Sequence, residues 1–373
     1  MKHSRIHTQT PSRKKDHVLL TVHKNVAFKS KRTGLGEWEF IHNALPELNF
    51  DEISTEAIFL SKKLSFPFLI SSMTGGYADA RRINKILAEV CEEHRIAMGV
   101  GSQRQALENS AFHSSFSVVR EAAPSIPIIG NIGAAEVARM SDISPAQKLI
   151  ELIRADAFAV HLNPLQEFLQ PEGNTNFRGV LGGIERLVRG LSIPVIVKEI
   201  GAGISRSVAQ RLLNVGVSII DVAGAGGTSW AGVEILRRKN IAHSGHVRRS
   251  KKNKNENAEL MFQHADGSED FWDWGIPTAD ALLEVASLKR TFPSLVLIAS
   301  GGITNGIEAA KALALGADIV ASARPMMQHL FAGGKKMLSR LIDQWRKELQ
   351  GVMFLTGAET TEDLHHVQMV RRH

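Results

Sequence analysis

The sequence predicts a (β/α)8 barrel, because eight short apolar runs alternate with segments of helical length. Each run is nearly continuous and rich in β-branched or small residues, which is typical of parallel strands buried on both faces. The runs cover residues 67–73, 96–102, 126–132, 157–163, 194–200, 218–224, 295–302 and 318–324. An open, doubly wound sheet has the same alternation and stays as the alternative at this point.

Amphipathic segments between the runs predict the barrel helices, for example over 78–94 and 205–216. In the segment 305–317, Ile307, Ala310, Leu313 and Ala314 share one face at helical spacing, and we expect that face to be buried. Between the sixth and seventh runs the chain is much longer. It predicts a long loop, including the basic stretch 237–254, followed by a helix within 272–290.

We expect a single domain over 1–373, with an N-terminal arm (1–60), the barrel (61–325) and a C-terminal helical tail (326–373). The net charge of +7 is local, since residues 1–32 carry nine Lys or Arg against one Asp, and 237–254 carry eight and no acid. A solvated loop explains the second cluster, and an anion-attracting rim near a site is the alternative. The cluster lacks interleaved aromatics and any recognisable module, so a nucleic-acid-binding function is disfavoured.

The single cysteine, Cys91, excludes an internal disulfide and a thiolate metal site. No apolar run approaches the roughly 20 residues that span a bilayer, and the first residues contain no apolar leader. From these features we expect a cytoplasmic protein without a membrane segment.

Residues just past the carboxyl ends of barrel strands face the active site. They include Ser72, Met73, Thr74, Ser102, Gln103, Arg104, Asn131, His161, Asn163, Gln166, Glu167, Lys198, Glu199, Thr228, Ala323 and Arg324. Two glycine-rich turns, GAGGT (224–228) and SGGI (300–303), favour a phosphate site, with N–H groups supplied by a helix beginning near Thr304. The alternative is that these glycines only make tight turns.

Three further features have two interpretations each. Lys198 is either a core ammonium paired with a carboxylate, or a cation that stabilises an anionic cofactor ring. Glu167 is either a salt-bridge partner or a ligand of Mg²⁺, which completes its shell with substrate phosphates and water. The basic trio 13–15 is either a solvated terminus or, with Arg104, a second anion site.

Nine segments together resemble one family, the type 2, FMN-dependent isopentenyl-diphosphate isomerases. They are RKKDHV (13–18), SSMTGG (71–76), GSQR (101–104), GNIGA (130–134), HLNPLQE (161–167), VKEIGAGIS (197–205), DVAGAGGTSWAGVE (221–234), WGIPT (274–278) and SGGITNGIEAAKALALGA (300–317). The glycine turns alone are common to many flavin barrels. GSQR followed by HLNPLQE is specific.

The resemblance implies a role for each matched residue. It implies FMN held by Ser72, Met73, Thr74, Ser102, Asn131, Lys198 and Thr228, with its phosphate at Gly301, Gly302, Ala323 and Arg324. It implies a substrate diphosphate at Arg13, Lys14, Ser102, Gln103 and Arg104, with Gln166 beside the reacting carbons of the substrate and Mg²⁺ on Glu167. The catalytic residues implied are Gln166, Lys198 and His161. It also implies NADPH as the flavin reductant and a homo-oligomer, a tetramer or an octamer.

Two departures from the family pattern stand out. The 237–260 stretch is longer and more basic than expected, and Arg324 stands where the family commonly has a small residue. The resemblance implies an isomerisation that moves a double bond by adding and removing protons. Reduced flavin would supply the acid, because no candidate side chain is an obvious strong acid. The alternatives are an FMN-dependent 2-hydroxy-acid oxidase or dehydrogenase, and a barrel that uses a cysteine on a nucleotide, which the position of Cys91 in a helix disfavours.

Overall fold

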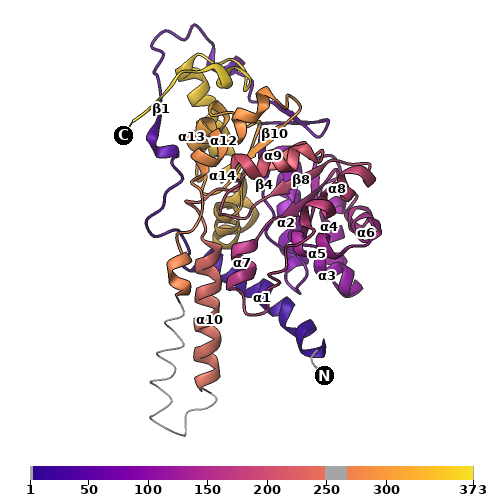
Figure 1. Ribbon diagram of the computed structural model, residues 1–373. Helices are drawn as coiled ribbons and strands as arrows, with labels where there is room; N and C mark the ends of the chain where they lie inside the picture. The colour runs from indigo at the N-terminus through magenta and orange to yellow at the C-terminus, as the bar shows by residue number, and fades with distance from the viewer. Residues whose placement is uncertain (1–2, 248–266, 373) are drawn as a thin grey trace.

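A computed structural model describes residues 3–247 and 267–372, with the backbone alone described for 3–12 and 240–247. Eight parallel strands within these residues close into a barrel in the order β10-β11-β4-β5-β6-β7-β8-β9 (Figure 1). The closed barrel confirms the predicted fold class. The strands are β4 (Phe68–Ile70), β5 (Ala97–Gly99), β6 (Ile128–Gly133), β7 (Ala157–His161), β8 (Val195–Lys198), β9 (Ile219–Asp221), β10 (Val296–Ala299) and β11 (Ile319–Ser322).

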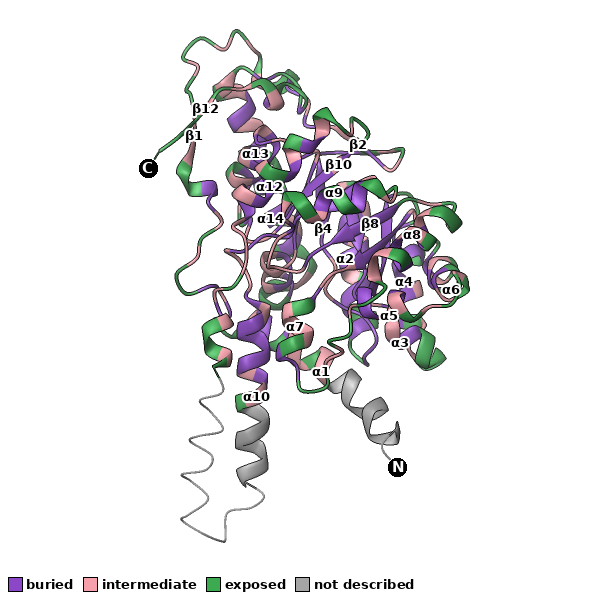
Figure 2. Ribbon diagram, in the orientation of Figure 1, coloured by how far each residue is buried: buried purple, intermediate pink, exposed green. Residues whose placement is uncertain are grey.

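Helices surround the strands, and the strands form the buried centre (Figure 2). The helices after the first four strands are α2 (Ala80–His94), α3 (Arg104–Glu108), α4 (Ser114–Ala122), α5 (Ala134–Arg139), α6 (Ser144–Ile153), α7 (Pro164–Leu169) and α8 (Val180–Gly190). The remaining ones are α9 (Arg206–Asn214), α10 (Trp230–Val247), α12 (Thr278–Ala286), α13 (Gly306–Ala314) and α14 (Arg324–Thr356). In α2, Ile83, Leu87 and Val90 recur at helical spacing and are all buried, which is the pattern that predicted this helix.

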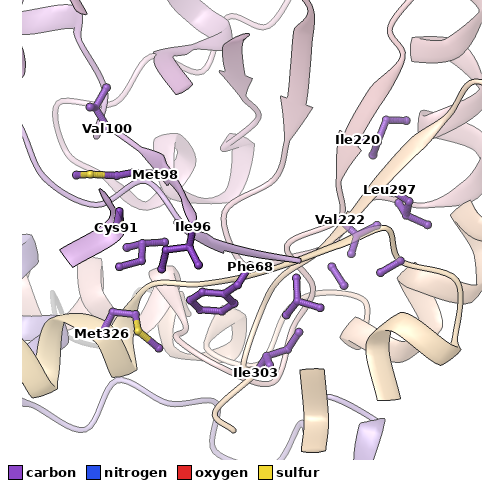
Figure 3. Packing of buried hydrophobic residues seen from close by; sticks show 14 of the residues in the cluster. Phe68, Cys91, Ile96, Met98, Val100, Ile220, Val222, Leu297, Ile303 and Met326 are labelled. Atoms are coloured by element: carbon purple, nitrogen blue, oxygen red, sulfur yellow. The ribbon is translucent and has the colours of Figure 1, made fainter. Parts of the chain in front are cut away.

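Strand residues alternate between two cores. Phe68 and Ile70 point outward into the cluster between strands and helices, whereas Leu69 points into the barrel. Figure 3 shows Phe68, Ile96 and Met98 in the outer cluster, together with Cys91. Cys91 is fully buried and burial raises the pKa of its thiol, so it does not serve as a catalytic nucleophile.

The barrel interior is closed at the amino end of its strands by the hairpin of β2 (Ala57–Phe59) and β3 (Lys62–Leu64), whose Phe59 and Leu64 join the inner core. Lys62 Nζ lies 2.7 Å from Asp156 Oδ1 and holds this hairpin to the barrel. The amino end is therefore plugged, and the carboxyl end remains for a site.

Three expectations are corrected by the structure. In α13, Ile307 is 47% exposed, because α13 packs through small residues and Gly306 lies against the backbone of Trp345 in α14. The tail is not wholly helical: α14 is interrupted at Gly333–Gly334, and β12 (Met369–Arg371) pairs antiparallel with β1 (Trp38–Phe40) of the arm. Residues 237–247 are helical in α10 rather than a loop, and 248–266 lie outside the described residues.

The arm also contains a long helix, α1 (His3–His23), which packs against α10 and α14. Figure 1 shows α1 passing beside α7 and α10 at one end of the barrel. Among the described residues, no helix combines the length and the apolar character that a membrane crossing requires.

Candidate active site

Two adjoining cavities lie at the carboxyl ends of the barrel strands. The first cavity has a volume of about 270 Å³ and the second about 140 Å³. Both are lined by Ser72, Met73, Lys198, Ile200 and Trp230, so they share a wall. Predicted site residues divide between them. The first also receives Thr228, Gly301, Gly302, Ala323 and Arg324, and the second receives Arg13, Lys14, Ser102, Arg104, Asn131, His161, Gln166 and Glu167.

Glycine turns form one end of the first cavity. A Cβ at Gly301, where φ is +103°, would overlap the carbonyl oxygen of Gly224, and a Cβ at Gly227 would overlap the amide of Gly302. Tight turn packing therefore requires these glycines. The same packing brings bare backbone to the cavity surface, which leaves backbone groups accessible to a ligand there.

The helix that faces this end is α14 rather than α13. The first N–H groups of α13 are already capped, since Gly306 N donates to Glu348 Oε2 (2.6 Å) and Glu308 N to Asn305 Oδ1 (2.8 Å). In contrast, Ala323, Arg324 and Pro325 at the beginning of α14 line the cavity. The first N–H groups of a helix lack partners within it and carry partial positive charge, so this end suits a phosphate.

Lys198 stands at the junction of the two cavities. Its Nζ donates to the carbonyl oxygen of Glu199 (2.6 Å) and lies 3.7 Å from Asp221 Oδ2. Burial raises the pKa of Asp221, and Lys198 together with a hydrogen bond from Ser300 Oγ (2.6 Å) opposes that rise. The lysine is thus both a buried, paired cation and a lining residue of each cavity.

His161 is held as a neutral imidazole. Asn131 Nδ2 donates to Val100 O (3.3 Å), which turns its Oδ1 toward His161, and Nδ1 of His161 donates to that oxygen (2.8 Å). Nε2 then carries the free lone pair. Burial, with the charges of Lys198 and Lys14, lowers the pKa of His161 to about 3.

Basic side chains gather at the second cavity. Lys14 Nζ donates to the carbonyl oxygen of Ser102 (2.7 Å), and burial followed by repulsion from Arg13 and Arg104 lowers the pKa of Lys14 to about 7. Arg104 bonds Glu108 (2.8 Å from Nε) and approaches Glu136 (3.2 Å). The basic trio is therefore split: Arg13 and Lys14 line the cavity, whereas Lys15 is exposed beside Asp79.

The HLNPLQE segment brings amides and one carboxylate to the same cavity. Asn163 Nδ2 donates both to Gln166 Oε1 (3.1 Å) and to Glu167 Oε1 (3.0 Å). The described residues contain no group of three His, Cys, Asp or Glu side chains able to hold a metal. Glu167 therefore fits Mg²⁺ only with oxygen ligands from a substrate and water.

Two predicted residues lie outside both cavities. Thr74 donates its hydroxyl to Asn84 Oδ1, and Gln103 is fully buried, with Nε2 donating to Leu149 O (3.0 Å) and Oε1 accepting from Asn131 N (3.0 Å). Thr74 holds the loop after β4 to α2, and Gln103 holds the loop after β5 to β6 and α6. Gln103 thereby orients Asn131, which in turn orients His161.

A buried carboxylate was missed by sequence reasoning. Glu234 Oε1 accepts from Gln166 Nε2 (3.1 Å) and lies 2.8 Å from His17 Nε2, while Oε2 accepts from Arg237 Nε (2.9 Å). Burial raises its pKa, but His17 and then Arg237 outweigh burial and lower the pKa to about 2. The available signal was spacing, because His17 follows Arg13 by one helical turn on α1.

The closed barrel and the sequence pattern of its second half together define an FMN-dependent barrel enzyme. The sequence pattern of the FMN-dependent dehydrogenase family matches residues 161–371. Among solved structures, a putative lactate oxidase of Pediococcus acidilactici aligns with a TM-score of 0.67 at 16% identity, covering 99% of this chain and 94% of that one. A flavocytochrome b2 mutant aligns with a TM-score of 0.65 at 15% identity, covering 98% and 85%. These likenesses show the fold.

Sequence relatives identify the particular family. The isopentenyl-diphosphate delta-isomerase of Chlorobaculum parvum is 46% identical over 368 residues, covering 98% of each chain. Those of Pelodictyon phaeoclathratiforme and Pseudescherichia vulneris are each 44% identical, covering 98% and 94% of both chains, respectively. The chain belongs to the isopentenyl-diphosphate delta-isomerase family.

Proposed function

We propose that the protein interconverts isopentenyl diphosphate and dimethylallyl diphosphate, using reduced FMN and Mg²⁺, in isoprenoid biosynthesis. One observation carries the proposal beyond family membership. A cavity built from glycine turns and a helix N-terminus meets, at Lys198, a second cavity that receives Arg13, Lys14 and Arg104. This arrangement provides two anion sites on either side of one buried cation, which suits a flavin phosphate and a substrate diphosphate.

The residues of the first cavity fit FMN. Gly301, Gly302, Ala323 and Arg324 would hold its phosphate, and Ser72, Met73, Lys198 and Thr228 would face its remaining atoms. Ser102 and Asn131 lie across the shared wall, on the second cavity. Reduced flavin supplies a proton donor and acceptor at N5 without net redox change. Lys198 favours the anionic form of the reduced ring, because an opposite charge nearby stabilises the ionised state.

The second cavity would hold the substrate by its diphosphate. Arg13, Lys14 and Arg104 contribute the charge, with Ser102 beside them, and Glu167 would hold Mg²⁺, which would supply further positive charge to the diphosphate. Binding at this end positions the small hydrocarbon end, which offers no polar handle of its own. Gln103 supports this cavity from beneath rather than touching the diphosphate.

The substrate would pass through a tertiary carbocation between the two proton transfers, so the site has to protect that cation. Gln166, fixed between Asn163 and Glu234, would orient the alkene. The pKa of His161 lies near 3, so the ring stays neutral and adds no positive charge beside the cation. Trp230 and α1 would exclude water, which quenches such a cation.

NADPH reduces the flavin, the chain assembles as a homo-oligomer (a tetramer or octamer), the protein is cytoplasmic, and residues 1–373 work as a single domain. Neither nucleic acid nor a membrane is a partner. The resemblance described above supports the reductant and the assembly.

The test is anaerobic conversion of isopentenyl diphosphate with Mg²⁺, comparing reduced FMN, oxidised FMN and no flavin. We expect product with reduced FMN alone and no flavin oxidised per turnover. Glu167→Gln is expected to raise the Mg²⁺ concentration needed for half-maximal rate. A protein that binds FMN but instead oxidises 2-hydroxy acids would contradict the proposal and establish the oxidase alternative.

A further inference from the structure

Arg324 ties the first cavity to the arm that lines the second. It begins α14 and lines the first cavity. Its Nε donates to the carbonyl oxygen of Thr21 (2.9 Å) and its Nη2 to that of Lys24 (2.9 Å). One turn further along α14, Gln328 Nε2 donates to Val22 O (3.4 Å). The C-terminal end of α1 is therefore fastened to the N-terminal end of α14.

These hydrogen bonds from α14 satisfy backbone carbonyl groups that otherwise have no partner at the end of α1. The last carbonyl groups of α1 lie beyond its internal hydrogen bonds and carry partial negative charge. A guanidinium presents donors in a fixed planar fork, so one side chain reaches both the Thr21 oxygen in α1 and the Lys24 oxygen just past its end. Because a lysine has one ammonium on a flexible chain, it does not reproduce this geometry.

One face of α1 spans both cavities. Lys14, Val18 and Thr21 are spaced by four and then three residues, so they lie on the same side of the helix. Lys14 and Val18 line the second cavity, and Thr21 lines the first. At about 1.5 Å of rise per residue, roughly 10 Å of rigid helix separates Lys14 from the tied end.

The guanidinium also keeps donors for a ligand. Within the described part of the chain, Nη1 of Arg324 has no hydrogen-bond partner. Burial lowers the pKa of Arg324, and no described carboxylate opposes it. A dianion at the glycine turns would neutralise this charge and meet the same guanidinium that holds α1.

We propose that Arg324 is a positioning residue that couples occupation of the phosphate end of the first cavity to the placement of Arg13 and Lys14 in the second. The inference rests on the proposed function, which puts a flavin phosphate in one cavity and a diphosphate in the other. Coupling of this kind is reciprocal, so the substrate diphosphate raises FMN affinity by the same factor.

The experiment compares full-length wild type with Arg324→Ala, Arg324→Lys and the control Arg340→Ala, an exposed arginine on the same helix. FMN affinity is measured by quenching of flavin fluorescence, with and without isopentenyl diphosphate. Amide hydrogen exchange of α1 is followed with and without FMN. KM and kcat are measured at saturating reduced FMN.

In wild type, we expect FMN to slow exchange in α1 and the diphosphate to raise FMN affinity about tenfold. Arg324→Ala loses both effects and raises KM about tenfold, while kcat changes by about threefold or less. Arg324→Lys keeps the charge and therefore FMN affinity, yet loses the slowed exchange and the low KM. Arg340→Ala behaves as wild type.

Arg324→Ala or Arg324→Lys with normal exchange, normal coupling and normal KM would overturn the proposal, leaving Arg324 as a phosphate contact at most. The exchange and fluorescence measurements need no turnover. A wild type that fails to isomerise but shows FMN-dependent protection of α1 would overturn the proposed function alone. A wild type in which FMN does not change amide exchange in α1 would overturn the coupling alone.

Discussion

His17 and Glu234 come from helices more than two hundred residues apart and meet with Nε2 and Oε1 2.8 Å from one another, beside the second cavity. Glu234 is completely buried and Arg237 binds its other oxygen at 2.9 Å. Helix α1 of the arm is thus joined to α10 of the barrel through a carboxylate that has no access to water.

Glu234→Gln is expected to destabilise the protein by about 3 kcal/mol, because it leaves the buried Arg237 with only Glu172 as a charged partner. Urea unfolding measures the loss. The exposed pair Glu185–Arg189 supplies a control, and Glu185→Gln should cost about 0.5 kcal/mol or less. Equal effects of the two changes would contradict the role given to Glu234.

The carboxylate of Glu234 should also make the stability of the protein depend on pH. Its pKa is about 2 in the folded protein against an ordinary 4.5, so the folded state releases this proton more readily than the unfolded chain. The stabilisation is complete above pH 4.5 and is lost as the pH falls toward 2. The difference in unfolding free energy between wild type and Glu234→Gln should therefore shrink over that interval.

Lys14 predicts that substrate affinity weakens in alkali. Its pKa of about 7 in the free protein means that it is charged below pH 7 and increasingly neutral above it, so KM for the diphosphate should rise from pH 7 to 9. In wild type this rise in KM should reach at most about tenfold per pH unit. Lys14→Arg keeps the charge throughout, so its KM should change little over the same pH range. Lys15→Arg, at the exposed pair with Asp79, is the control and should keep the wild-type slope.

Lys198→Met is expected to lower kcat by about 100-fold or more, since it removes the cation at the junction of the cavities and leaves Asp221 buried without it. The measurement uses chemically reduced FMN at saturation. Lys289→Met breaks another lysine–aspartate pair, with Asp318 at 2.7 Å, away from both cavities. It should lower stability and leave kcat unchanged. A similar fall in kcat in the two variants would show that Lys198→Met acts through the structure rather than through the site.

Gly301→Ala should destabilise the protein by about 3 kcal/mol and weaken FMN binding, because φ is +103° and the new Cβ overlaps the backbone of Gly224. Gly351→Ala provides the contrast. It lies in α14 with nothing within 4 Å of a Cβ, so it should stabilise by about 0.5 to 1 kcal/mol. Thermal unfolding and flavin fluorescence report the two effects separately.

The barrel was predictable because each strand is a short apolar run, buried on both faces, and most strand-end residues then followed from the geometry of parallel strands. Side-chain direction was not predictable. Gln103 and Thr74 follow strands as expected, yet each turns to a neighbouring helix, α6 or α2, for a hydrogen bond. Ile307 fits an apolar face by spacing, but packing against α14 favours small residues instead.

Contacts between distant segments were also beyond sequence reasoning. The pairing of His17 with Glu234 depends on where α1 crosses the barrel, and no local pattern contains that information. Arg237 belongs to the basic stretch 237–254, which the sequence predicts to be a solvated loop. It is buried because two carboxylates, Glu172 and Glu234, neutralise it in the fold.

The pairing of Trp38–Phe40 with Met369–Arg371 has a consequence for how the chain is made. The first of these strands leaves the ribosome more than three hundred residues before its partner. At about 5 to 20 residues per second, the arm waits roughly 20 to 70 seconds for the strand that secures it. The pairing that joins the arm to the tail therefore forms only after all eight barrel strands have emerged.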